Sequence, residues 1–267
     1  MMDLDYLHDK LFEMLKVIDS ICNEENITYF MDTGSAIGTV REHGFIPWDD
    51  DIDILMKRRD YMRFRKIIRK KLPTNYKFVD PRDNAPFFYD FIPQIIDMDT
   101  PLREETDEDK AYKNFNNRAC IDIFILDDGP KSKVAQTVMR FKLKMLYGMA
   151  MSKRYKIKYK KYSFIEKIEI CVLTIIGKPF SLEKIHRAYF KESTKYMKHK
   201  SEYYMRSNPP FLYMQFYKKE YFSEVVPMTF RDYIVPMPIG YDEVLKQQYG
   251  DYMTPERDSK KYITHVN

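Results

Sequence analysis

Residues 45–56 read FIPWDDDIDILM, and they decide how the rest of the chain is interpreted. Asp49, Asp50, Asp51 and Asp53 fall directly before an apolar run. Alternate residues of a strand point to the same side, so Asp51 and Asp53 are predicted to present their carboxylates together. Two carboxylates at that spacing repel each other, but a divalent cation reverses the sign of the interaction because it prefers such oxygen ligands. The stretch therefore predicts a cation site at the mouth of a strand.

The first two aspartates of this run have a simpler explanation. Asp49 and Asp50 follow Pro47, and aspartate is common in exposed turns. We expect them to be surface-turn residues, with a position just outside the direct ligands of the metal as the alternative. Asp51 and Asp53 are flanked by apolar residues rather than by Gly or Ser, which favours the metal for that pair.

A third carboxylate is expected from a neighbouring strand. Asp122 lies in the apolar run CIDIFIL, and a lone buried carboxylate costs several kcal/mol unless it is paired, hydrogen-bonded or bound to a metal. We therefore expect Asp122 to be a ligand or a base. Asp127 and Asp128, beside Gly129 and Pro130, are interpreted as turn residues.

A Gly-Ser turn precedes the aspartates. Gly34 and Ser35 close a predicted strand over 27–32 and open a helix that Gly44 ends. Such a turn aims backbone N–H groups and a hydroxyl at a nearby phosphate. The turn alone is common in loops, but together with the carboxylate pair Asp51 and Asp53 it predicts a phosphate and metal site.

The remaining pattern mixes helices and strands. No repeat or low-complexity linker divides the chain, so we expect one domain over 1–267. We expect a catalytic core over 1–130, a helical addition over 131–200, and a C-terminal segment over 201–267 that packs back on the core. The elements expected from periodicity and breakers are helices over 3–25, 58–71, 131–153, 163–176, 181–200 and 242–249, strands over 76–80, 87–99 and 119–130, and an acidic loop over 103–110.

Composition sets broader limits. Lys and Arg number 45 against 40 Asp and Glu, a weak bias toward anionic partners such as nucleotides, phosphoglycans or a membrane surface. Three widely spaced cysteines fit a reducing compartment and give no zinc spacing. The basic segment 151–161 is best explained as an exposed interhelical connection, with contact to nucleic acid or anionic lipid as the alternative.

The start of the chain lacks the features of a signal peptide. The longest apolar run, residues 168–177, is about half as long as a bilayer span requires. We therefore expect a cytoplasmic protein, either free or at the inner face of the cell membrane.

Three segments carry a family resemblance. MDTGSAIGTVREHGFIPWDDDIDILMKRRDY, residues 31–61, resembles the signature of the LicD family of phosphotransferases, relatives of the fukutin-type transferases. CIDIFILDDGP, residues 120–130, is similar to the family's Val-Asp-Ile-Phe-Pro-Leu-Asp segment, and residues 241–265 are similar to its closing Tyr-Gly-Asp motif and final His. Ile125 stands where Pro is common, and Arg231 stands where an acidic residue usually follows the Phe, a departure that bears on recognition of the donor head group.

The resemblance implies an α+β fold, with a nucleotidyltransferase-like mixed β-sheet flanked by helices and a helical C-terminal half. It implies transfer of a phosphorylated alcohol, most typically phosphocholine from CDP-choline, onto a hydroxyl of a cell-surface glycan such as teichoic acid, capsule or lipopolysaccharide, with release of CMP. Carried over to this chain, Gly34 and Ser35 hold the donor phosphates, Asp51 and Asp53 bind the metal, and Asp122 completes the carboxylate set.

The expected cofactor is Mg²⁺ or Mn²⁺, which would neutralise the donor pyrophosphate during in-line attack. Asp122 is then a second metal contact or the acceptor of the hydroxyl proton. Arg41 and Arg118 are candidate phosphate clamps or surface ion pairs. His265 is a substrate-binding candidate through the resemblance alone, and His43 is more simply a helix-end residue. The expected partners are a CDP-linked alcohol and a glycan or lipid-linked glycan acceptor, with a peripheral membrane contact and no nucleic acid.

Two other classes compete with this interpretation. A nucleotidyltransferase that moves NMP from an NTP to a small molecule or nucleic acid uses the same Gly-Ser and Asp-x-Asp arrangement. A basic binding module for glycans or membranes would need no chemistry, and its function would survive Asp51→Asn.

Overall fold

The computed structural model describes residues 3–88, 90–113, 115–157, 162–209 and 214–255, and it confirms an α+β fold. Within these ranges one mixed sheet has the order β1-β2-β5-β4-β3, with β6 added on β5 and β7 on β6. The strands of this sheet are β1 (Tyr29–Met31), β2 (Ile52–Lys57), β3 (Tyr76–Val79), β4 (Gln94–Pro101), β5 (Arg118–Gly129), β6 (Tyr203–Arg206) and β7 (Phe216–Lys218).

Helices surround the sheet. They are α1 (Leu4–Glu24), α2 (Thr33–Ile37), α3 (Arg58–Lys71), α4 (Asp107–Tyr112), α5 (Lys133–Ala150), α6 (Phe164–Gly177), α7 (Leu182–Ser193) and α8 (Tyr241–Tyr249). Short non-α turns are η1 (Gly38–Glu42), η2 (Met151–Lys153) and η5 (Lys219–Phe222). A separate hairpin pairs β8 (Val225–Phe230) with β9 (Tyr233–Pro238).

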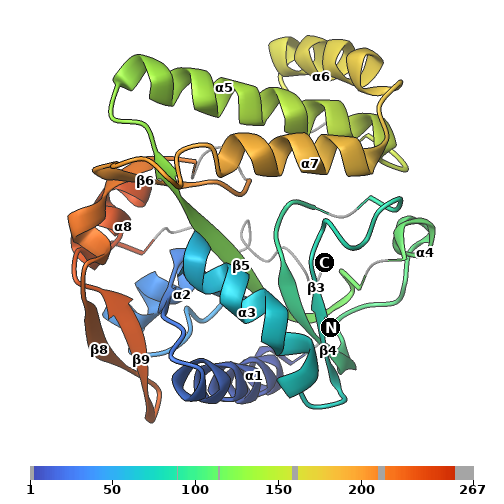
Figure 1. Cartoon of the computed structure of the whole chain (residues 1–267). Coiled ribbons are helices and arrows are strands. Elements are labelled where there is room, and N and C mark those ends of the chain that lie inside the picture. The colour runs from blue at the N-terminus through green and yellow to red at the C-terminus, as the bar shows by residue number, and fades with distance from the viewer. Residues whose placement is uncertain (1–2, 89, 114, 158–161, 210–213, 256–267) are drawn as a thin grey trace.

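Strand β5 is the centre of the sheet (Figure 1). It pairs in parallel with β2 and antiparallel with β4, and its last residues pair antiparallel with β6. A parallel neighbour requires a crossover, and here the chain passes through α3, β3, β4 and α4 between the two strands. Residues far apart in sequence are thereby placed side by side.

The two faces of β2 and β5 are buried differently. Ile52, Ile54 and Met56 join the main core with apolar residues of α1 and α3, which cover that face. Leu55 of β2 and Phe124 of β5 face the other way, into a smaller cluster with Val244 of α8. Because side chains alternate along a strand, the even positions of β5 and the odd positions of β2 share this second face.

Helices α5, α6 and α7 lie together beyond one end of β5, with α6 outermost on α5 (Figure 1). They occupy the region where a helical addition was expected. The rest of the second half of the chain differs from a helical half, because four strands, β6 to β9, intervene before α8. No helix in the described ranges has both the length and the apolar character needed to cross a bilayer.

Two local expectations are wrong. The acidic loop contains α4, whose first turn is closed by a capping box in which Thr106 and Asp109 bond each other's backbone N–H. Asp127 is not a turn residue: it lies within β5, is 0% exposed and accepts two 2.7 Å hydrogen bonds from Arg58. The neighbouring Gly129 and Pro130 suggested a turn, but β5 continues as far as Gly129.

Candidate active site

The carboxylates expected at the mouth of β2 converge. Asp53 is the register partner of Asp122 across the parallel β2–β5 pair. Carboxylate oxygens of Asp51, Asp53 and Asp122 all lie within 4.8 Å of one another. The two residues of the Asp-x-Asp pair are thus directed to the same side, and the neighbouring strand supplies a third carboxylate. Oxygen ligands at this separation are the set that a hard divalent cation prefers.

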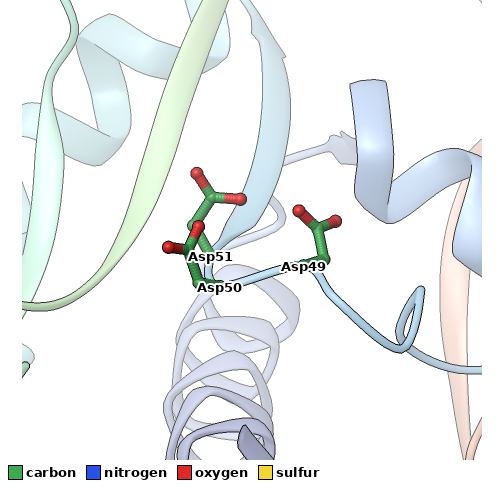
Figure 2. A group of neighbouring side chains, drawn as sticks. All are labelled: Asp49, Asp50 and Asp51. Carbon is green, nitrogen blue, oxygen red and sulfur yellow. The ribbon is translucent and has the colours of Figure 1, made fainter. Parts of the chain in front are cut away.

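The three consecutive aspartates lie along the loop that leads into β2 (Figure 2). Oxygens of Asp49, Asp50 and Asp51 also lie within 4.8 Å of one another, so Asp51 belongs to both groups. The expectation that Asp50 is a surface-turn residue is wrong, because it is 1% exposed. Asp49 is half-buried. Its backbone N–H donates a 2.9 Å hydrogen bond to the Ile46 carbonyl oxygen, which closes the turn.

The cluster is electrostatically strained. Desolvation and then the charges of Asp51 and Asp122 raise the pKa of the Asp53 carboxyl well above its usual range, while Arg206 acts in the opposite direction. Arg206, on β6, is 1% exposed and forms a 3.3 Å ion pair with Asp32. Its guanidinium also lies over the Phe124 ring, 3.5 Å from the centroid. A buried positive charge therefore offsets part of the repulsion.

Hydrogen bonds fix the carboxylates of the two strands. The Thr33 hydroxyl donates to one oxygen of Asp53, and the Gln94 amide donates to one oxygen of Asp122 at 2.6 Å. Thr33 has φ of +44°, an unfavourable conformation for a β-branched residue. The Asp53 backbone N–H donates to the Ser35 hydroxyl at 2.9 Å, which ties the Gly-Ser turn to β2. Each strand thus presents its carboxylate in a defined orientation.

Gly34 packs closely against the aspartate turn. A Cβ added at Gly34 would lie 2.5 Å from a carboxylate oxygen of Asp49. From the other side, His8 of α1 contacts the Asp49 carbonyl oxygen through Nε2 at 2.7 Å. A carbonyl can only accept, so this nitrogen carries the proton. Burial lowers the pKa of His8, and its ring stacks on Phe45 with centroids 4.1 Å apart.

The two arginines predicted as phosphate clamps contact groups other than the three carboxylates. Arg41 donates to Glu42 and to the Tyr252 carbonyl, and Arg118 donates to the Met98 carbonyl. Arg118 is four positions before Asp122, or about 13 Å along an extended strand. Their roles as phosphate clamps, and those of Gly34 and Ser35 in holding phosphate, stay predictions. His265 lies outside the described residues.

His43 ends the η1 turn with φ of +52° and accepts a 2.7 Å backbone hydrogen bond from Arg231, so its interpretation as a helix-end residue is confirmed. Trp48, next to the aspartate turn, packs against the main core.

Three residues near the carboxylates were missed by sequence reasoning. Gln94 follows Pro93 at the start of a strand, and its contact with Asp122 depends on the pairing of β4 with β5. His8 is one polar residue in an otherwise regular amphipathic helix, and Arg206 lies in a Tyr-rich tail with no motif. A charged residue within an apolar strand, the signal that identified Asp122, is the feature that would have found Arg206.

Comparison with known proteins gives three findings. Residues 26–90 match the family model described as the LicD/FKTN/FKRP nucleotidyltransferase domain. The chain is 26% identical over 264 residues to the lipopolysaccharide cholinephosphotransferase LicD of Haemophilus influenzae, covering 97% of this chain and 91% of that protein. Uncharacterized proteins of Rickettsia typhi and Rickettsia prowazekii are 31% and 33% identical over 25% and 22% of this chain, and in both cases over 22% of their own length.

The matched range contains the Gly-Ser turn and the aspartate run, while Asp122 and Gln94 lie beyond it. The similarity to the Haemophilus protein extends over the remaining elements as well. The resemblance to the LicD family predicted from the sequence motifs is therefore confirmed by the family model over residues 26–90 and by similarity to the Haemophilus LicD protein over nearly the whole chain.

Proposed function

We propose that this protein transfers a phosphorylated alcohol, most simply phosphocholine from CDP-choline, onto a hydroxyl of a cell-surface glycan and releases CMP. The observation that carries the proposal is the convergence of Asp51, Asp53 and Asp122 from two adjacent strands. Similarity to a lipopolysaccharide cholinephosphotransferase over nearly the whole chain supports the choice of reaction. A nucleotidyltransferase-like arrangement of the sheet belongs to the same proposal and is supported by the family match over residues 26–90.

The donor set fits a divalent cation. Three carboxylates within 4.8 Å supply only hard oxygen ligands, which suit Mg²⁺ or Mn²⁺ rather than zinc. Asp51 and Asp53 would hold the ion, and Asp122 would either complete its ligand set or act as the base. When bound, it would neutralise charge on the donor pyrophosphate. In the absence of a cation, desolvation and repulsion from the neighbouring carboxylates raise the pKa of Asp53. A bound cation would relieve that repulsion.

The residues of the chain then act mainly by positioning. Gln94 and Thr33 orient the two paired carboxylates, and Ser35 fixes the turn beside them. During transfer the acceptor oxygen forms a bond to phosphorus as the bond from phosphorus to the CMP oxygen breaks. The acceptor hydroxyl proton passes to a carboxylate, and Asp122 is our candidate for that carboxylate. The hydrogen bond from Gln94 holds one Asp122 oxygen and thereby fixes the orientation of the whole carboxylate group.

The proposed partners follow from the reaction. They are a CDP-linked alcohol and a glycan or lipid-linked glycan, and we propose that the protein meets both in the cytoplasm or at its membrane boundary. Three cysteines in positions that form no disulfide fit a reducing compartment.

Product analysis tests the proposal. The purified protein is incubated with CDP-choline, CDP-ethanolamine, CDP-glycerol or CDP-ribitol, a lipopolysaccharide-derived oligosaccharide acceptor and Mg²⁺, and CMP is followed by NMR. We expect CMP release that requires both metal and acceptor. Asp53→Asn should reduce the rate at least about 10²-fold, as is typical when an electrostatic catalytic group is lost.

The matched control is Asp19→Asn. Asp19 is a buried carboxylate that accepts hydrogen bonds from Tyr29 and Tyr233, away from the metal ligands, so this variant should keep its activity. Release of pyrophosphate from an NTP, in place of CMP from a CDP-alcohol, would identify a nucleotidyltransferase instead. Equal rates for Asp53→Asn and Asp19→Asn would rule out the proposed site.

A further inference from the structure

Helix α6 is apolar on two opposite sides. One side is buried on α5: Ile170, Leu173 and Gly177 face it, and a Cβ on Gly177 would lie 2.1 Å from the Met149 carbonyl oxygen. The other side is open. Ile165, Ile168, Val172 and Ile175 are 71%, 51%, 49% and 66% exposed.

The exposed residues form one continuous row. Positions 165, 168, 172 and 175 follow the three- and four-residue spacing that places side chains on one face of a helix. Single exposed apolar residues are normal, but a contiguous row on the outermost helix of a protein marks an interaction surface. We call this row the outer face of α6.

Helix α5 extends the same surface. Lys144 pairs with Glu169 at 2.8 Å, and Leu173 lies against Gly148, so the two helices pack side by side and run in the same direction. Phe141 lies three positions before Lys144 and seven before Gly148, a spacing that places it on the side of α5 that faces α6. Its side chain is 61% exposed. Apolar side chains are therefore exposed on both helices.

The same region has a large excess of positive over negative charge. Residues 131–200 contain 19 Lys and Arg against four Asp and Glu, whereas the remaining residues contain 26 against 36. The net charge of the whole chain, +5, conceals this separation. An apolar helix face within a strongly basic segment complements a surface that is anionic at its boundary and apolar beneath it.

We propose that the outer face of α6 docks on an anionic lipid bilayer. Fourteen residues of helix extend about 21 Å, too short to span the hydrocarbon layer, so α6 would lie in the plane of the interface. Its isoleucines would enter the boundary between head groups and acyl chains, while neighbouring lysines contact anionic head groups. The inference rests on surface composition and is independent of the phosphotransfer reaction.

Vesicle co-sedimentation tests the docking. The full chain is mixed with vesicles of phosphatidylcholine alone or of phosphatidylcholine with phosphatidylglycerol. We expect binding to the anionic vesicles that is at least about tenfold stronger than to neutral ones and that falls as salt rises. The triple variant Ile165→Ser, Ile168→Ser, Ile175→Ser should bind at least about tenfold more weakly, because three apolar side chains no longer leave water.

A matched variant controls for general loss of surface hydrophobicity. Val225→Ser, Ile234→Ser, Ile239→Ser removes three side chains that are 47%, 56% and 46% exposed on other elements, and it should bind as the unmodified protein does. Thermal melting of both variants checks that the fold is kept.

A probe on Cys171 gives a measurement that needs no change to the outer face. Cys171 lies on α6 and is exposed, whereas Cys22 and Cys120 are buried, so a thiol-reactive environment-sensitive dye should label it selectively. Its emission should shift to shorter wavelength on anionic vesicles. The proposal is overturned by equal binding to both kinds of vesicle, by unchanged binding of the α6 variant, by a dye that reports only water, or by binding of single-stranded RNA while vesicles are ignored.

Discussion

Removal of one charge from the carboxylate cluster should stabilise the protein in the absence of metal. Oxygens of Asp51, Asp53 and Asp122 lie within 4.8 Å of one another. At that separation two unit charges repel by about 3.5 kcal/mol at an effective dielectric constant of about 20, and by about 0.9 kcal/mol in water. Asp53 takes part in two such pairs, but its raised pKa and the charge of Arg206 already relieve part of the repulsion.

We therefore expect Asp53→Asn to raise the free energy of unfolding of the metal-free protein by about 1–3 kcal/mol. For a chain of this size each kcal/mol corresponds to about 2–4 °C in Tm. The amide oxygen of Asn can still accept the hydrogen bond that Thr33 donates to Asp53, so that contact should survive.

Calorimetry with and without Mg²⁺ provides the assay. After treatment with a chelator, the variant should melt above the unmodified protein. Addition of Mg²⁺ at about 100 times its Kd should stabilise the unmodified protein by about 2.7 kcal/mol and the variant much less. Asp19→Asn, the control outside the cluster, should respond to Mg²⁺ as the unmodified protein does. A metal-free Asp53→Asn that melts lower, together with an unmodified protein that ignores Mg²⁺ and Mn²⁺, would refute the reasoning.

Three further outcomes can be measured. Gly34→Ala should weaken the Tm response to Mg²⁺ because the new methyl group, 2.5 Å from an Asp49 oxygen, displaces that side chain; an unchanged titration would contradict this. Burial lowers the pKa of His186 to about 4 from the usual 6.5, so the unfolded chain takes up the proton first and stability is lost as pH falls through 6.5 toward 4. Urea denaturation should show that the free energy of unfolding falls by about 2 kcal/mol between pH 7 and pH 5, and that this loss is absent in His186→Phe. The same pH dependence in both proteins would contradict a role for His186. Arg58→Met should cost about 3–5 kcal/mol by leaving the Asp127 carboxylate buried without its guanidinium, whereas Arg58→Met with Asp127→Leu should recover much of that loss.

Local patterns predicted the elements that carry the cluster. Alternation in DIDILM located β2, helical periodicity located α1 and α3, and a lone carboxylate in an apolar run identified Asp122. These features succeed because each is decided within a few residues. The spacing of Asp51 and Asp53 predicted a shared carboxylate site, and the parallel pairing of β2 with β5 places Asp122 beside it.

Long-range pairings explain what the sequence could not supply. Asp127 was assigned to a turn because its buried partner, Arg58, lies 69 positions earlier, and no local rule connects them. Likewise Gln94 reaches Asp122 only when β4 pairs with β5. The acidic segment before α4 has high charge but also a capping box, and the cap decided its structure. Residues whose environment comes from a distant strand remain invisible to local patterns.

The position of β5 at the centre of the sheet limits how small a working fragment can be. Residues 26–90, the portion that matches the family model, contain β2 but neither β5 nor β4. A fragment cut to that range would expose the edge of β2 along its full length, and an unprotected edge invites pairing between chains. It would also lack the Asp122 carboxylate. We expect such a fragment to aggregate and to bind Mg²⁺ weakly, so gene truncations that keep only the signature motif should not yield an active product.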